Sequence, residues 1–165
     1  MLQSTFNDLE ALKVAINIER RGERFYNLAA DKLEDENEEA AAMLRRLARE
    51  ETKHAKVFEE LYSEALKHKD DFDDTYLFDP EVAAYFNNIV SSLIFPSDER
   101  QDELLADIDS VEDAIRLGIQ AEKDSILFYT EMIAESKYED AKKAFKKLLA
   151  QEKRHLRELQ ELLGE

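Results

Sequence analysis

The amino-acid sequence predicts an all-α protein, a four-helix bundle built from two αα-hairpins. Its 165 residues include only two prolines and three glycines, and so few helix-breaking residues favour long helices. Apolar residues recur in alternating steps of three and four along four long segments, the spacing of a seam between packed helices. We expect a single domain over residues 1–165, because a chain of this length can bury a core of its own.

The first predicted hairpin spans residues 5–67. Its helices cover residues 5–33 and 38–67, and each carries an apolar stripe that includes acidic residues. The stripe of the first helix contains Glu19 and Glu23.

The second predicted hairpin spans residues 110–163. Ser110 is a suitable N-cap for its first helix, and Asp113 lies where a capping box would place an acid. The last helix covers residues 139–163.

Residues 68–109 connect the two hairpins and are too many for a bundle turn. The segment has the length to cross back along a bundle of about 40 Å. Asp79 and Pro80 favour the start of a helix, so we expect a short helix over residues 81–94. We also expect the crossover to pack on the bundle and to help form a homodimer.

The two hairpins resemble each other in sequence, as if one unit were used twice. An offset of 103 residues aligns their first helices and an offset of 101 aligns their second helices. The difference falls in the loops, where deletions are tolerated. The aligned polar pairs are Glu19 with Glu122, Tyr26 with Tyr129, Glu51 with Glu152, and His54 with His155.

Charge and cysteine content exclude several classes of function. A formal net charge of −16 argues against binding to nucleic-acid phosphates and to anionic membranes. The absence of cysteine excludes disulfides, iron–sulfur ligation and thiolate zinc sites. No apolar run reaches the ~20 residues of a membrane span, and residues 1–4 do not begin a secretory signal. A cytoplasmic protein is the expectation.

Two Glu-x-x-His motifs, one in each hairpin, point to a metal site. Residues three apart share one face of a helix, so each motif can offer an ion a carboxylate and an imidazole. Several carboxylates buried without cations are costly, and two bound ions remove that cost. The oxygen and nitrogen donors suit iron or manganese, and zinc could replace them. The six predicted metal ligands are Glu19, Glu51, His54, Glu122, Glu152 and His155.

Other interpretations of these residues are open at this point. The acids could lie on a solvated flank of the helices, with ordinary, partly buried histidines beside them. Glu23, one turn after Glu19, could be an additional ligand or an acid that reaches solvent.

With these six residues in place, the chain resembles the rubrerythrin branch of the ferritin-like superfamily, over essentially all four long helices. The resemblance implies a ferritin-like bundle that holds two iron ions. It also implies that Glu51 and Glu152 bridge the ions and that Glu19 and Glu122 are terminal ligands.

Tyr26 and Tyr129 match the family in residue type. Each lies seven residues after a terminal glutamate, two turns along the same face. From there a phenol could hydrogen-bond a ligand carboxylate, and the alternative is a plain core tyrosine.

Two features depart from the family pattern. Full-length rubrerythrins carry a cysteine-ligated, rubredoxin-type iron domain, whereas this chain has no cysteine and ends at Glu165. We therefore expect an external electron donor, such as a rubredoxin. Rubrerythrins also have an extra glutamate at the position of Ser125, and its absence makes the site more symmetric, closer to bacterioferritin.

The resemblance suggests a non-haem diiron oxidoreductase that reduces hydrogen peroxide or dioxygen in oxidative-stress defence. The main alternative is a ferroxidase, or an iron-binding or storage protein, of the same superfamily. A metal-free helical scaffold and an oxygenase acting on an organic substrate are the remaining hypotheses.

Overall fold

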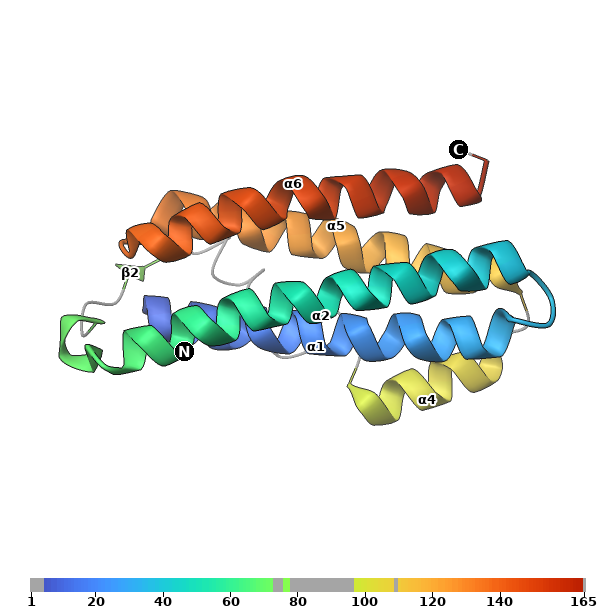
Figure 1. Cartoon of the computed structure of the whole chain (residues 1–165), viewed down its shortest axis with the longest axis horizontal. Coiled ribbons are helices and arrows are strands. Elements are labelled where there is room, and N and C mark those ends of the chain that lie inside the picture. The colour runs from blue at the N-terminus through green and yellow to red at the C-terminus, as the bar shows by residue number, and fades with distance from the viewer. Residues whose placement is uncertain (1–4, 73–75, 78–96, 109, 165) are drawn as a thin grey trace.

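The computed structural model describes residues 5–72, 76–77, 97–108 and 110–164. Within these residues, four long helices run side by side along the molecule (Figure 1). They are α1 (Asp8–Leu33), α2 (Glu38–Leu66), α5 (Val111–Glu135) and α6 (Glu139–Leu162). Helices α1 and α2 pack together as one hairpin, and α5 and α6 form the other. The prediction of an all-α bundle of two hairpins is confirmed.

Side chains cap three of the four long helices at the N-terminus. At α1, Asn7 accepts a hydrogen bond from the Glu10 backbone, and the Glu10 carboxylate accepts one from the Asn7 backbone. This capping box starts the helix at Asp8, three residues after the predicted start. At α5, Ser110 accepts from the backbone of Asp113, as the sequence predicts.

The residues just before α1 are extended and not helical, which corrects the predicted boundary. Strand β1 (Thr5–Phe6) pairs antiparallel with β2 (Tyr76–Leu77), and each strand has only two residues. The pair links the start of the chain to the crossover segment.

A helix that the sequence analysis missed lies in the crossover. Helix α4 (Asp98–Asp107) packs beside α1 and buries Gln101 and Leu105 (Figure 1). Its local signal is an N-cap, Ser97, followed by acidic residues in the first turn. A short 3₁₀ helix (Lys69–Phe72) precedes it. The helix expected over residues 81–94 lies outside the described residues.

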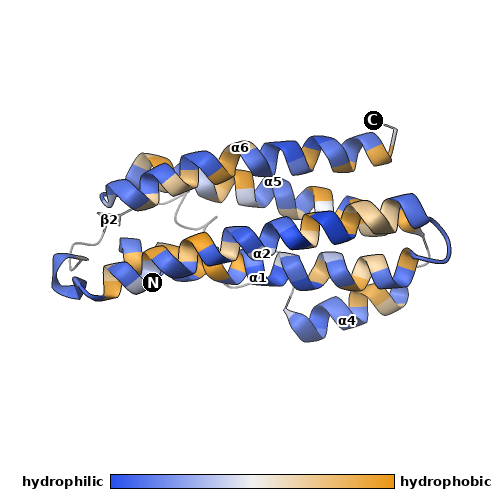
Figure 2. Ribbon diagram, viewed as in Figure 1, coloured by the Kyte–Doolittle hydropathy of each residue, from blue (hydrophilic) through white to orange (hydrophobic). Residues whose placement is uncertain are grey.

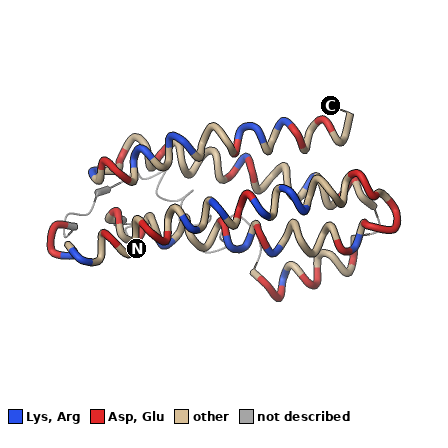
Figure 3. Tube along the Cα trace, viewed as in Figure 1, with Lys and Arg blue, Asp and Glu red and all other residues tan. Residues whose placement is uncertain are grey.

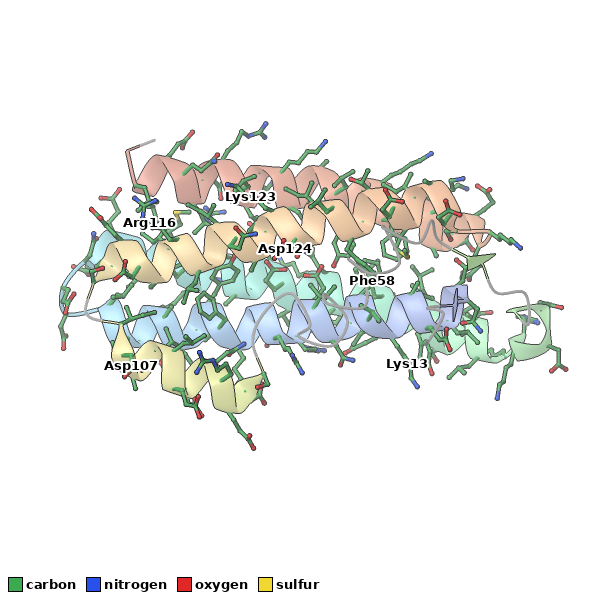
Figure 4. All side chains as sticks on the ribbon, turned by 180° about the vertical axis from the view of Figure 1, so that it is seen from behind. Lys13, Phe58, Asp107, Arg116, Lys123 and Asp124 are labelled. Carbon is green, nitrogen blue, oxygen red and sulfur yellow. The ribbon has the colours of Figure 1, made fainter. Side chains whose placement is uncertain are left out.

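The core runs along the axis of the bundle and is rich in aromatic side chains. Hydrophobic residues recur along every long helix, and acidic and basic residues alternate with them along the chain (Figures 2 and 3). Among the described residues, the fully buried aromatic side chains are Phe25, Tyr26, Phe58, Phe128, Tyr129 and Phe145. Figure 4 shows Phe58 inside the bundle and Lys13 and Lys123 on its outside. Within the described residues, no helix has both the length and the apolar character that crossing a bilayer requires.

Candidate metal centre

The six predicted ligands meet in the middle of the core. Each of the four long helices contributes, with α2 and α6 supplying a glutamate and a histidine and α1 and α5 a glutamate each. None of the six is more than 2% exposed. The alternative of acids on a solvated flank therefore does not describe these residues.

The candidate ligands form two groups of four that share two members. Glu51 and Glu152 belong to both groups. Glu19 and His54 complete one group, while the other is completed by Glu122 and His155. Within each group the potential ligand atoms lie within 4.8 Å of one another, close enough for one ion to contact all four after small side-chain movements.

Helix geometry explains why each motif points inward as a unit. Glu51 and His54 follow Leu47 and precede Phe58 on one stripe of α2, and both apolar neighbours are fully buried. In α6 the second motif is flanked in the same way by apolar residues of the core. The seam that holds the two hairpins together therefore also holds the ligands.

Both histidines direct the same ring nitrogen toward the acids. His54 Nδ1 lies 3.3 Å from Glu19 and 2.8 Å from Glu152. His155 Nδ1 lies 3.2 Å from Glu51 and 3.5 Å from Glu152. The two rings stack with centroids 5.5 Å apart. Nδ1 is thus the imidazole atom available to an ion.

The outer nitrogen of each histidine contacts a residue that the sequence analysis did not single out. His54 Nε2 is 2.7 Å from Gln151 Oε1, and His155 Nε2 is 2.7 Å from Glu50 Oε2. Each partner immediately precedes a shared glutamate, and the offset of 101 that relates the motifs also relates Glu50 to Gln151. That offset was the signal that could have identified them.

The two tyrosines hydrogen-bond the outer glutamates, each reaching across to the other hairpin. Tyr26 Oη donates to Glu122 Oε1 at 2.5 Å, and Tyr129 Oη donates to Glu19 Oε1. Burial and the nearby carboxylates raise the pKa of both phenols well above 10.0. Both phenols therefore keep their protons and act as donors.

Protonation of the buried acids and histidines depends on their mutual contacts. Burial by itself would lower the pKa of His54 and His155. Each Nδ1 lies within 3.5 Å of three glutamates, however, and this contact with the carboxylates outweighs burial and raises the pKa far above its ordinary value. Burial raises the pKa of Glu19 and Glu122, and repulsion from the other acids raises it further.

The shared glutamates behave in the opposite way. Burial would raise the pKa of Glu51 and Glu152, yet the nearby histidines and an outer glutamate stabilise the ionised form and bring the pKa below its ordinary value. Without metal, protons on the histidines and outer acids thus balance the two ionised carboxylates.

The polar atoms left over in this cluster fit a bound cation. Among the described residues, the buried side-chain atoms without a hydrogen-bond partner are Glu51 Oε1, Glu122 Oε2, Glu152 Oε1 and His155 Nδ1. Leaving buried polar atoms unpaired is costly, and their four residues make up one of the two ligand groups. Carboxylate and imidazole donors together suit iron or manganese.

Two further residues named from the sequence lie around the centre. The carboxylate of Glu23 pairs with Arg20 at 2.9 Å and is 29% exposed, so it lies on the flank of α1 and outside both ligand groups. Ser125 is buried one turn after Glu122 and brings no carboxylate to the site.

Comparisons with known proteins concern the family and the fold. The family model described as rubrerythrin matches residues 10–163. A Thermotoga maritima structure described as a ferritin-like diiron-carboxylate protein superposes with a TM-score of 0.74 at 28% identity, covering 98% of this chain and 97% of that one. A hypothetical protein from Pyrococcus furiosus shares the fold, with a TM-score of 0.61 at 24% identity, covering 92% of this chain and 85% of that one. The search of curated proteins found no match.

Proposed function

The chain belongs to the rubrerythrin family, and we propose that it is a non-haem diiron oxidoreductase that reduces hydrogen peroxide or dioxygen. One observation carries the proposal: two buried four-ligand groups share two carboxylates inside a helical bundle. Shared carboxylates can hold two ions at the ~3.5–4 Å separation that is typical of two-metal sites.

Each buried residue has a proposed task in this site. Glu51 and Glu152 would bridge the ions, because each belongs to both groups. Glu19 with His54, and Glu122 with His155, would complete one position each.

Two bound ferrous ions would supply the two electrons that, with two protons, convert hydrogen peroxide to two water molecules. The protein's own contribution is to hold the ligands and exclude bulk water. Tyr26 and Tyr129 hold the outer glutamates through their hydrogen bonds, and their raised pKa keeps those bonds in place near neutral pH. The fully buried ring of Phe58 follows His54 by one turn of α2 and packs against the ring of Tyr129.

Anaerobic reaction with peroxide tests the activity. In protein loaded with ferrous iron, each molecule of hydrogen peroxide should oxidise two iron ions. The absorbance of ferric iron and the concentration of residual peroxide measure the reaction. A Glu152→Ala variant should bind no iron pair and react no faster than the same concentration of free iron. A Glu23→Gln variant is the matched control, since its carboxylate pairs with Arg20 on the flank of α1. Equal rates for wild-type protein and Glu152→Ala would refute the proposal.

Iron oxidation for uptake or storage is the second candidate. Ser125 favours it, because this buried position brings no additional carboxylate and leaves the ligand set symmetric. Iron storage requires a hollow shell of many subunits. Light scattering that shows a homodimer would therefore exclude a storage function. A ferroxidase would consume dioxygen with excess ferrous iron faster than it consumes peroxide.

The remaining parts of the proposal concern partners and location. These 165 residues contain no cysteine, so electrons would come from a donor outside this sequence, such as a rubredoxin. Manganese or zinc could replace iron with the same ligands. We propose that the protein is cytoplasmic. We also propose that it is a homodimer, which gel filtration with calibrated light scattering can measure.

A further inference from the structure

The candidate metal centre is symmetric in every ligand pair but unsymmetric in the residues behind its histidines. The two hairpins supply equivalent glutamates, histidines and tyrosines, and the two tyrosine bonds are equivalent as well. Glu50 and Gln151 occupy equivalent places one residue before the shared glutamates. One is a carboxylate and the other a neutral carboxamide.

The two contacts match in geometry and differ in charge. Glu50 Oε2 and Gln151 Oε1 each lie 2.7 Å from the Nε2 atom of a histidine on the opposite hairpin. A carboxylate can only accept, so His155 carries a proton on Nε2 and presents Nδ1 to the ligand group. His54 presents its Nδ1 in the same way when Gln151 accepts through its oxygen.

Ion pairs on the outer side hold Glu50 in place. Arg46 Nη1 lies 3.1 Å from Glu50 Oε1, and Arg154 Nη2 lies 2.5 Å from Glu50 Oε2. Both arginines are about two-fifths exposed, at 39% and 44%, so solvent screens their pairing. The side chain of His155 is fully buried, and its hydrogen bond to Glu50 is not screened in this way.

We propose that Glu50 makes the two metal positions unequal, so that the ion held by His155 and Glu122 binds first and more tightly. A carboxylate that accepts from the outer N–H of a ligand histidine makes the inner nitrogen a stronger donor, and such partners change metal affinity about 10- to 100-fold. A carboxamide has a weaker effect because it carries no charge. Glu50 is thus a positioning residue that acts through His155, and the inference rests on the proposed dimetal site.

The test uses Co²⁺ as the probe, added without oxygen to metal-free protein. Proton NMR in water then detects the paramagnetically shifted Nε2–H signals of the ligand histidines. At one equivalent of Co²⁺, the occupancy ratio of two independent positions is the square root of their affinity ratio. A 10- to 100-fold difference in affinity should therefore make one histidine signal about three to ten times the other. At two equivalents the two signals should be equal.

Reciprocal variants identify the signals and test the cause. Glu50→Gln makes both acceptors carboxamides and Gln151→Glu makes both carboxylates, so either variant should bring the half-loaded ratio to within about twofold. Glu50→Gln should also shift the signal that is stronger in the wild type. Glu158→Gln is the matched control. Glu158 pairs with Arg46 at 2.7 Å and with Arg154 at 3.8 Å, on the outer side of the site, and its replacement should keep the ratio of the wild type.

The outcomes separate this inference from the proposed function. Equal signals in half-loaded wild-type protein, or a dominant signal that shifts in Gln151→Glu and not in Glu50→Gln, would overturn the role of Glu50 while leaving the dimetal site intact. Failure to bind two Co²⁺ ions would overturn the proposed function itself. If Glu50→Gln does not fold, Gln151→Glu tests the inference by itself, because it gives both histidines a carboxylate acceptor and should make the two metal affinities equal.

Discussion

The sharing of Glu51 between two ligand groups leads to a quantitative prediction about stoichiometry. Glu51→Ala should weaken both metal positions, whereas Glu19→Ala should weaken one, because Glu19 belongs to a single group. The ligand atoms within a group are at most 4.8 Å apart. An ion among these atoms would lie within about 4 Å of the Glu51 carboxylate. At that distance and an effective dielectric constant near 20, a pair of unit charges interacts by ~4 kcal/mol, which is a lower bound for a divalent ion. That energy corresponds to roughly a thousandfold loss in affinity for each position that loses the carboxylate.

Equilibrium dialysis against Co²⁺ or anaerobic Fe²⁺, followed by elemental analysis, measures the effect. At a metal concentration that saturates the wild-type protein with two ions per chain, we expect Glu19→Ala to hold one ion and Glu51→Ala to hold none. Circular dichroism checks that both variants remain helical, and Glu23→Ala is the control that should hold two. The assignment fails if Glu51→Ala binds two ions at unchanged affinity, or if Glu19→Ala loses both.

Further predictions concern protons, hydrogen bonds and packing. Binding two divalent ions should release two protons from the histidines, and up to four where the outer glutamates are also protonated, because all four groups have a raised pKa in the metal-free site. Metal affinity should therefore rise with pH, and calorimetry in buffers of different ionisation enthalpy counts the protons; release of fewer than one would contradict the scheme. Tyr129→Phe removes the donor to Glu19 and should lower the free energy of unfolding of the metal-free protein by about 1–3 kcal/mol in urea titrations. A variant as stable as the wild type would show that this bond is not formed in solution. Phe58→Ala should cost about 3–5 kcal/mol in the same assay, since the ring is fully buried against the rings of Tyr129 and Phe145. A loss below about 1 kcal/mol would mean that the core collapses around the missing ring.

Much of the fold and of the candidate centre could be predicted because the information is local. Apolar residues recur every three or four positions along each helix and mark the face that packs on the other helices. An acid at one of these positions must face the other helices as well. The sequence repeat aligns Glu19 with Glu122 and the first Glu-x-x-His motif with the second. Each predicted ligand in one hairpin therefore had an equivalent in the other. The late start of α1 was missed because the Asn7 capping box is a short signal beside a long periodic one. Helix α4 was missed because its apolar pattern is weak.

The sequence by itself determined which residues face the core, since helical periodicity assigns each side chain to a face whatever the neighbouring helix is. Only the tertiary structure decided which partners meet across helices. The phenols of Tyr26 and Tyr129 reach the glutamate of the opposite hairpin, and the outer nitrogens of the histidines reach Glu50 and Gln151. Those contacts depend on the axial register and separation of the two hairpins, which arise from packing the whole core and which no local pattern encodes.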